Sequence, residues 1–322
     1  VVMKLQLRNR ALHCLYRVRG ESIREAMNTS KQGNRSLPVI SLLFSATLWG
    51  VVWYPLRLLE GQGLAGLWSA LVSYGAILCV FSWVLVRERQ SLATNLLPLV
   101  LMGLSAGWCN VAFIMAVLDG HVVRVLLLFY LSPFWAVCLG WLMLGERLDG
   151  RSMLVFAIAV TGAIIMLWNE AVGIPWPRDN ADWLAVSSGF FFALSNVFVR
   201  RTQGASVLLK SAASWSGVVV VATLWILLAH TGLPAVSAAV ILAAVALGLC
   251  GFLVMTLSVL YGVTHMPVHR SAVILLFELV IGAVSSLLLT DEVVLYREWF
   301  GGLMIVTAAY MAARIHAGDV DG

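Results

Sequence analysis

Residues 268–290 read VHRSAVILLFELVIGAVSSLLLT, an apolar stretch whose interior holds one charged side chain, that of Glu278. An α-helix rises 1.5 Å per residue, so about 20 apolar residues cross the hydrocarbon core of a bilayer. Nine other stretches of similar length and composition fill most of the chain. We therefore predict ten membrane spans: residues 37–59, 64–86, 93–117, 123–145, 152–170, 181–200, 207–230, 235–262, 268–290 and 296–315.

The composition also favours a lipid environment. Of the 322 residues, 61% are hydrophobic and 11% are charged, whereas soluble domains have about 45–50% apolar and about 25% charged residues. The apolar runs are continuous, which predicts helices, because the strands of a membrane barrel alternate apolar and polar residues. The expected fold is an all-α integral membrane protein of ten transmembrane helices. A soluble two-domain enzyme of this length is excluded.

Lysine and arginine residues gather in alternate loops. Seventeen of the 21 lie in the N-terminal tail or near the turns that follow even-numbered spans. Positively charged loops remain in the cytoplasm, so both termini are predicted to be cytoplasmic, with the chain in the cytoplasmic (inner) membrane of a bacterium. The net charge of +5 follows from this topology and does not require a nucleic-acid partner.

Residues 1–36 are predicted to form a basic, disordered cytoplasmic tail. They lack the apolar core and the cleavage site that a secretory signal peptide would have. The sequence begins with two valines, which suggests a misplaced start, and Met27 is the alternative first residue.

The two halves of the sequence repeat each other. A shift of 146 residues aligns Arg124 with Arg270 and Glu146 with Glu292. In both halves, therefore, an arginine lies at the start of an apolar span and a glutamate lies just past its end. The predicted repeats are residues 37–170 and 181–316. Because each contains five spans, an odd number, the second enters the membrane in the opposite orientation. Inverted repeats recur in secondary transporters, and duplication retained for packing alone is the alternative.

Several motifs, in this order, resemble those of EamA-type members of the drug/metabolite transporter superfamily. They are Leu48-Trp49-Gly50, Leu131-Ser132-Pro133, Leu144-Gly145-Glu146-Arg147-Leu148, Ala193-Leu194 with Arg200-Arg201, Phe277-Glu278 through Asp291-Glu292, and Trp299-Phe300-Gly301-Gly302. The resemblance covers about residues 37–316 and implies a ten-helix, inverted-repeat carrier that exports small metabolites. The chain departs from the family at Leu279, where members often have proline. The kink that Pro133 gives the fourth span is therefore not expected in the ninth.

Glu278 is the leading candidate for a functional residue. It lies about eight to ten residues into its span, roughly 12–15 Å deep and near the middle of the membrane. A charged carboxylate there costs several kcal/mol unless it is paired or hydrated, so such residues usually face an interior cavity. We interpret Glu278 as a ligand for a cationic substrate or as a proton-coupling group. The alternative is a structural role, in which Glu278 is protonated or hydrogen-bonded and only connects neighbouring helices.

Other residues within the spans are assigned to the same site. Trp49, Tyr130, Asn110, Asn196 and Ser132 are its predicted lining, and Arg270, Arg124 and Pro133 are assigned to the path or its gating. Each has a structural alternative: aromatic packing, hydrogen bonding between helices, or the snorkelling of Arg270, Arg124 and His269 to lipid headgroups. The sequence GLSAG at residues 103–107 is interpreted as a helix contact through small residues.

The sequence holds no ATP-binding Gly-x-x-x-x-Gly-Lys motif, no His-Glu-x-x-His motif and no metal-ligand set, so no cofactor, metal or enzymatic activity is predicted. Energy would then come from an ion or solute gradient. The predicted function is a secondary transporter that exports a small organic metabolite, such as an amino acid, by alternating access. Its partners would be that substrate, membrane lipid and, if Glu278 couples transport to proton movement, protons. A receptor or scaffold and an unrecognised intramembrane enzyme are the alternatives.

Overall fold

The structure, a computed structural model, describes residues 36–119, 122–168, 177–289 and 295–318, and every regular element in these ranges is helical. Nearly all of the predicted N-terminal tail lies outside them. Seven helices in the described residues are long and apolar enough to cross a membrane. They are Ser36–Gly61, Leu96–Ala116, Gly150–Leu167, Asn180–Arg201, Val207–Leu228, Ala238–His265 and Val268–Leu289. Gly66–Phe81 and Ser132–Leu144 are shorter apolar helices.

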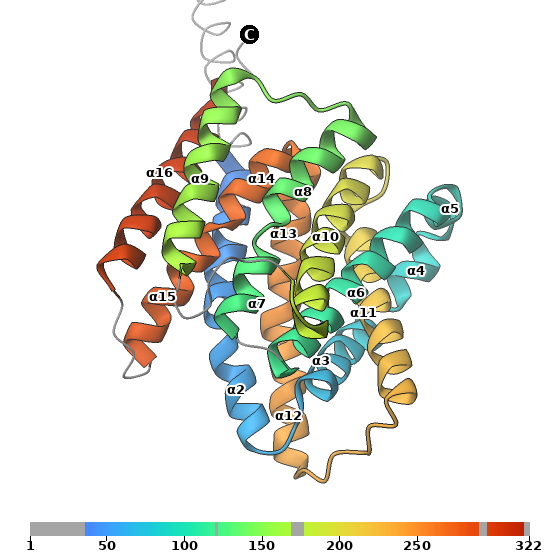
Figure 1. Ribbon diagram of the computed structural model, residues 1–322. Helices are drawn as coiled ribbons and strands as arrows, with labels where there is room; N and C mark the ends of the chain where they lie inside the picture. The colour runs from blue at the N-terminus through green and yellow to red at the C-terminus, as the bar shows by residue number, and fades with distance from the viewer. Residues whose placement is uncertain (1–35, 120–121, 169–176, 290–294, 319–322) are drawn as a thin grey trace, which may run out of the picture.

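Turns and short π-helical segments divide several of these helices into parts. The labelled elements are α2 (Trp53–Gly61), α3 (Gly66–Phe81), α4 (Trp83–Arg87), α5 (Arg89–Thr94), α6 (Leu96–Asp119), α7 (Val122–Phe129), α8 (Ser132–Leu139), the π-helix η1 (Gly140–Leu144), α9 (Gly150–Leu167), α10 (Asn180–Arg201), α11 (Val207–Leu228), α12 (Ala238–Ala246), the π-helix η2 (Leu247–Phe252), α13 (Leu253–His265), α14 (Val268–Leu275), α15 (Phe277–Leu289) and α16 (Tyr296–Gly318). Figure 1 shows them gathered into one bundle.

Side-chain caps set the first residues of three long helices. The N–H groups of Ser152, Asp182 and Leu209 donate to the side chains of Asp149, Asp179 and Ser206 at 3.0, 2.9 and 3.0 Å. These bonds satisfy backbone N–H groups that have no partner within the first helical turn. Hydrogen bonds from Ser152 also lower the pKa of the Asp149 carboxyl. The caps therefore explain why α9, α10 and α11 begin within two residues of the predicted starts.

The fourth and ninth predicted spans are both interrupted. α7 and α8 are separated at Tyr130 and Leu131, beside Pro133, which has no backbone N–H to donate. α14 and α15 are separated at Leu276, although residue 279 is leucine. The expectation that the ninth span lacks a break is therefore wrong. A tight turn, in which the Leu279 N–H donates to the Leu276 carbonyl at 3.0 Å, forms there without proline.

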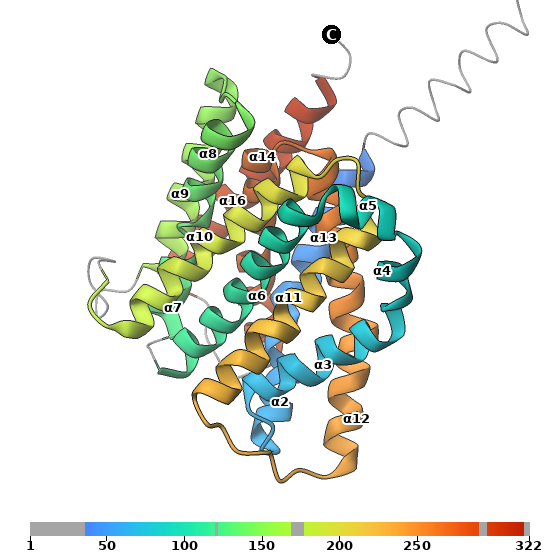
Figure 2. The ribbon, with the colours of Figure 1, turned by 90° about the vertical axis from the view of Figure 1, so that its right-hand side faces the viewer.

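Small residues allow α6 and α11 to approach closely. α6 lies between α10 and α11 and packs extensively against both (Figure 2). A Cβ atom added at Gly103, Gly107 or Gly217 would collide with backbone atoms of the facing helix. The predicted small-residue contact at residues 103–107 is therefore confirmed, and its partner is α11.

Gly217→Ala is expected to destabilise the protein, because the added Cβ would meet the backbone of Gly103. Overpacking of this kind costs about 1–3 kcal/mol, so the unfolding temperature in detergent should fall by several degrees. Gly75→Ala is the matched control. Gly75 also lies inside a helix, α3, but nothing lies within 4 Å of the Cβ atom that the substitution would add. Equal unfolding temperatures for the two variants would contradict the close contact of α6 and α11.

Large apolar side chains cover the outside of the bundle. Leu97, Leu142 and Leu288 are 70%, 72% and 75% exposed. Soluble proteins rarely expose extended apolar surfaces, whereas helices in a bilayer present them to lipid. Together with the seven long apolar helices, this surface confirms an all-α integral membrane protein.

Candidate substrate site

Glu278 lies in the first turn of α15, directly after the break at Leu276. The hydroxyl of Tyr130 interacts with the Glu278 carboxyl. Tyr130 itself occupies the other break, between α7 and α8. Cys109 of α6 is also close enough to Glu278 for an electrostatic interaction. The structure thus brings the leading candidate into contact with a second candidate from the other half of the chain.

The two interruptions fall at equivalent positions of the two halves. The shift of 146 residues aligns Glu278 with Ser132, which is buried at the start of α8. Broken helices at corresponding positions of two repeats are the usual binding elements of membrane transporters, because their ends present backbone groups to a solute or ion. Ser132 is the first residue of α8 and Glu278 is the second residue of α15, so both lie in the first turn after an interruption.

The first helix closes one side of the site. A Cβ atom added at Gly50 would lie 2.8 Å from the Glu278 carbonyl oxygen. The Ser285 hydroxyl donates to the Gly50 carbonyl at 2.9 Å, and Trp53 Nε1 donates to Ser285 Oγ at 2.9 Å. The first helix and α15 are therefore in direct backbone contact at the level of Glu278.

Aromatic and polar side chains continue the site toward α3 and η2. Asn110, which follows Cys109 in α6, accepts a hydrogen bond from the Tyr74 hydroxyl at 3.5 Å. The Tyr74 ring stacks on Phe252 with centroids 4.9 Å apart, and Phe252 lies 5.8 Å from the Trp49 ring. Asn110 and Trp49 are thus linked to the neighbourhood of Glu278, and their described contacts are interhelical packing and hydrogen bonding.

The remaining candidates are not brought to Glu278 by any described contact. Asn196 is buried within α10. Pro133 is buried in the first turn of α8, immediately after the break. Arg124 falls in α7, but its side chain, like the whole of Glu292, lies outside the described residues. The assignments of Asn196 and Arg124 to the site or its path stay predictions.

The sequence GLSAG at residues 103–107 fits the Gly-x-Ser-x-Gly pattern of serine hydrolases, so the expectation that this motif is absent from the sequence is wrong. That motif requires a strained turn between a strand and a helix. Here Ser105 is buried within continuous α6 and donates to the Leu101 carbonyl at 2.6 Å. Ser105 is therefore a packing residue and not an exposed nucleophile.

A second polar cluster lies at the end of the bundle where the basic residues gather, which we call the basic end. Glu146 follows η1 and accepts a hydrogen bond from the Val268 N–H at 2.9 Å, so it caps the start of α14. Its carboxylate oxygens lie 3.5 Å from Arg200 Nε and 3.3 Å from His269 Nδ1. These contacts join the first half of the chain to α10 and α14 of the second.

Thr264 and Lys210 extend this cluster. Arg200 Nη1 donates to the Thr264 carbonyl at 2.9 Å, and Lys210 Nζ donates to Thr264 Oγ1 at 3.1 Å. Lys210 is fully buried in the first turn of α11, although the sequence suggested a loop charge. The expectation that His269 snorkels to headgroups is wrong, because its ring is buried beside the carboxylate. We call Glu146, Arg200, His269, Lys210 and Thr264 together the Glu146 cluster.

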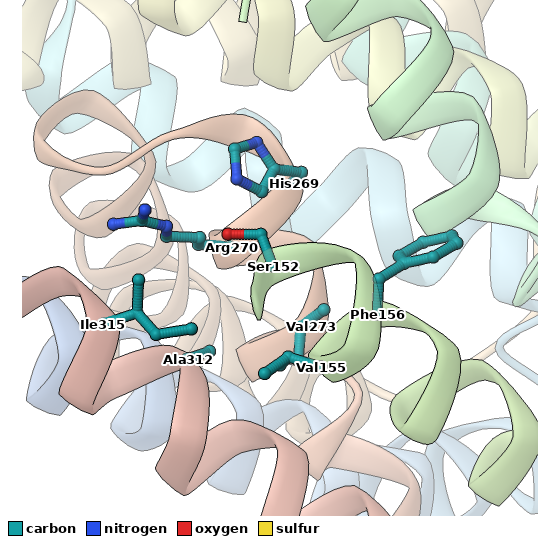
Figure 3. A pocket seen from close by; sticks show the side chains of 8 residues that line it. All are labelled: Ser152, Val155, Phe156, His269, Arg270, Val273, Ala312 and Ile315. Carbon is teal, nitrogen blue, oxygen red and sulfur yellow. The ribbon is translucent and has the colours of Figure 1, made fainter. Parts of the chain in front are cut away.

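Arg270 lies beside the Glu146 cluster in α14. With Ser152 and Ala312 it lines a small cavity among α9, α14 and α16 (Figure 3), whose volume is about 10 Å³. That volume is near the minimum that one water molecule needs. A cavity of this size holds no organic substrate, so it does not test the role of Arg270 in the path. That role also stays a prediction.

The apolar helices that are long enough to cross a membrane define a polytopic membrane protein. The model of the EamA-like transporter family matches residues 36–168 and again residues 180–314. The chain belongs to this family and contains its characteristic domain twice.

Individual relatives agree with this assignment. The uncharacterized transporter PA0485 of Pseudomonas aeruginosa is 31% identical over 128 residues, which are 38% of this chain and 40% of that protein. The match therefore spans less than half the length of the relative. A crystal structure of another protein is similar with a TM-score of 0.65 and 17% identity, over 88% of this chain and 99% of that one. At that identity the likeness shows the fold alone.

Proposed function

We propose that this protein is a secondary transporter that exports a small organic metabolite by alternating access, with Glu278 at its central site. The observation that carries the proposal is the contact between Glu278 and Tyr130, because each lies at a helix break in a different repeat. Paired broken helices around a polar group are the arrangement in which transporters bind substrates and coupling ions. Packing alone would not need an ionisable side chain at a depth where a charge is costly.

Ten crossings in two inverted repeats fit this function. The seven long helices, the two shorter apolar helices and α16 supply ten segments within the described residues. Figure 2 shows the first helix leading away from the basic end, whereas α10, the first helix of the second family domain, leads toward it. Five crossings in each repeat would produce this opposite orientation. The basic end then faces the cytoplasm of a bacterium.

The surroundings of Glu278 favour an amine-bearing solute. Tyr130 supplies a hydrogen-bonding group beside the Glu278 carboxyl, and Trp49, Phe252 and Asn110 belong to a chain of aromatic and polar contacts on neighbouring helices. A carboxylate can bind either an ammonium group or a proton. We therefore propose an amino acid or a related compound as the substrate, and competition between substrate and proton for Glu278 as the coupling.

The Glu146 cluster supports alternating access, because it closes the basic end with contacts between the repeats. Glu146 belongs to the first repeat, and Arg200 and His269 belong to the second. Glu146 and Arg200 have side chains that are 14% and 22% exposed, but the facing atoms, Glu146 Oε1 and Arg200 Nε, are buried. Removing one partner of a buried ion pair is costly, so the intact cluster would favour the closed form of the basic end, and its contacts would separate together when that end opens.

Transport by the reconstituted protein tests this proposal. A thermal-shift screen against a metabolite library should first identify a ligand, since binding to the native state raises the unfolding temperature. Proteoliposomes should then exchange the labelled ligand, and a pH-sensitive dye trapped inside should report coupled proton movement. Binding without exchange would indicate a receptor or scaffold, and a chemically altered ligand would indicate an enzyme. Either result would contradict the proposed function.

A further inference from the structure

A wider cavity opens between α6, α10 and α11 at the end of the bundle opposite the basic end, where these helices meet in the lower part of Figure 2. Its volume is about 630 Å³. It is lined by Trp108, Trp183, Trp225, Asp119, Asn180 and Ser187, together with two apolar side chains. Its described lining shares no residue with the candidate substrate site or with the Glu146 cluster, so it is a separate feature.

Described contacts hold two of its aromatic walls in place. Trp108 Nε1 donates to Ser187 Oγ at 3.1 Å. The Trp108 ring packs edge-on against Trp225, with centroids 5.8 Å apart and an interplanar angle of 66°, and lies 5.9 Å from the Phe191 ring. Indole rings fixed in this way present a preorganised aromatic surface, so a ligand would not have to order them on binding.

The lining that the structure describes combines these aromatic rings with one negative charge. Asp119 is its only charged member, and no lysine, arginine or histidine joins it there. A carboxylate pairs with an ammonium group, and the faces of indole rings attract cations through their quadrupole. The chemistry of the cavity therefore favours a ligand with a positively charged nitrogen.

The polar and apolar parts of the lining are arranged by depth. Asp119 is the last residue of α6 and Asn180 is the first of α10, so both lie at the helix ends. Met115 and Leu184 lie one helical turn deeper in the same two helices. Trp183 is 58% exposed, so the cavity is open to the side of the bundle. A phospholipid has this order of groups, whereas a soluble ammonium ion lacks the apolar part.

We propose that this cavity binds a phospholipid with an ammonium headgroup, in the leaflet opposite the basic end. The ammonium group would lie between Asp119 and the indole of Trp183, and the acyl chains would run along Met115 and Leu184. The competing interpretation is that the tryptophans are interfacial anchors, which hold helix ends at the membrane surface without selecting a headgroup. Headgroup selectivity separates the two interpretations.

Native mass spectrometry of the full-length protein measures that selectivity. The protein is mixed with phosphatidylethanolamine or phosphatidylglycerol of identical acyl chains, and the retained lipid is counted. We expect preferential retention of phosphatidylethanolamine, reduced about threefold or more in Asp119→Asn and in Trp183→Ala, as loss of a charge partner or of a cation–π face predicts. Equal retention of the two lipids by the unaltered protein would overturn the proposal.

Matched variants and a soluble probe complete the test. Glu60→Gln and Trp299→Ala remove an exposed carboxylate and an exposed indole that lie outside the described lining, so they should retain phosphatidylethanolamine as the unaltered protein does. An equal loss in these controls would overturn the assignment to this cavity. Free phosphoethanolamine should not displace the lipid at equal concentration. Displacement would show that the site takes a soluble ammonium compound instead of a lipid.

Discussion

Glu278→Gln is expected to reduce pH-driven counterflow of substrate in proteoliposomes by at least about tenfold, which corresponds to about 1.4 kcal/mol of lost interaction. Glutamine keeps the shape of the side chain and can still accept a hydrogen bond from Tyr130, but it neither ionises nor carries a proton. A transporter that couples through this carboxylate would therefore lose its response to a pH gradient. It would also lose its attraction for an ammonium group. The measurement is the initial rate of labelled substrate exchange, with and without the gradient.

Two further variants make this result interpretable. Glu60→Gln is the matched control, because Glu60 is exposed near the end of α2 and lies away from the helix breaks. Tyr130→Phe removes only the hydroxyl that contacts Glu278, so its flux should fall less and should still respond to pH. Intact pH-driven counterflow in Glu278→Gln would contradict the coupling role. Loss of a monodisperse, folded protein in that variant would instead identify Glu278 as a structural residue.

Hydropathy predicted the long membrane helices well, because each crossing needs about 20 apolar residues and little else in the sequence competes with that signal. The predicted starts at residues 181, 207 and 268 agree with Asn180, Val207 and Val268, the first residues of α10, α11 and α14. Two of these starts also carry side-chain caps, which are local signals. Start positions were therefore predictable from nearby residues.

The interruptions inside the spans were harder to predict. Pro133 predicts the break between α7 and α8, since proline cannot donate the helical hydrogen bond. The break at Leu276 has no such residue, because Leu279 replaces the proline that the family often carries. Leucine favours a helix, so this break depends on packing against other helices and is invisible to local propensity. The alignment of Tyr130 with Leu276 by the repeat was the available signal.

The site was predicted residue by residue but not as an arrangement. Glu278 was proposed because a charged group in the middle of a span is costly and so needs a reason, and Tyr130 because it lies just before the kink at Pro133. Their contact joins residues from the two halves of the chain, which only tertiary packing decides. Glu146 was noticed as a charge shared by both repeats, yet its partners Arg200 and His269 were assigned to topology and to headgroups. Because these charges were used only to predict the orientation of the chain, the ion cluster that they form was not predicted.

Glu146→Gln is expected to open the basic end of the protein. The amide can still cap α14, but it loses the electrostatic attraction for Arg200 and for a protonated His269. If closure weakens by about 1.4 kcal/mol, the ratio of open to closed forms rises about tenfold. The measurement is the rate at which an impermeant maleimide labels a cysteine introduced at Ala272, which is buried in α14. The native cysteines are first replaced, and the reagent is applied to the basic end.

Controls separate closure from simple destabilisation. Glu292→Gln removes the glutamate that the repeat aligns with Glu146, and it should not raise labelling at the basic end. The double variant Glu146→Gln with Arg200→Gln should label no faster than Glu146→Gln alone, because the first change already removes the pair. Additive increases would show that the two residues act separately. Unchanged labelling in Glu146→Gln, together with a lower unfolding temperature, would reduce the role of Glu146 to capping α14, and closure of the basic end would then require another set of contacts.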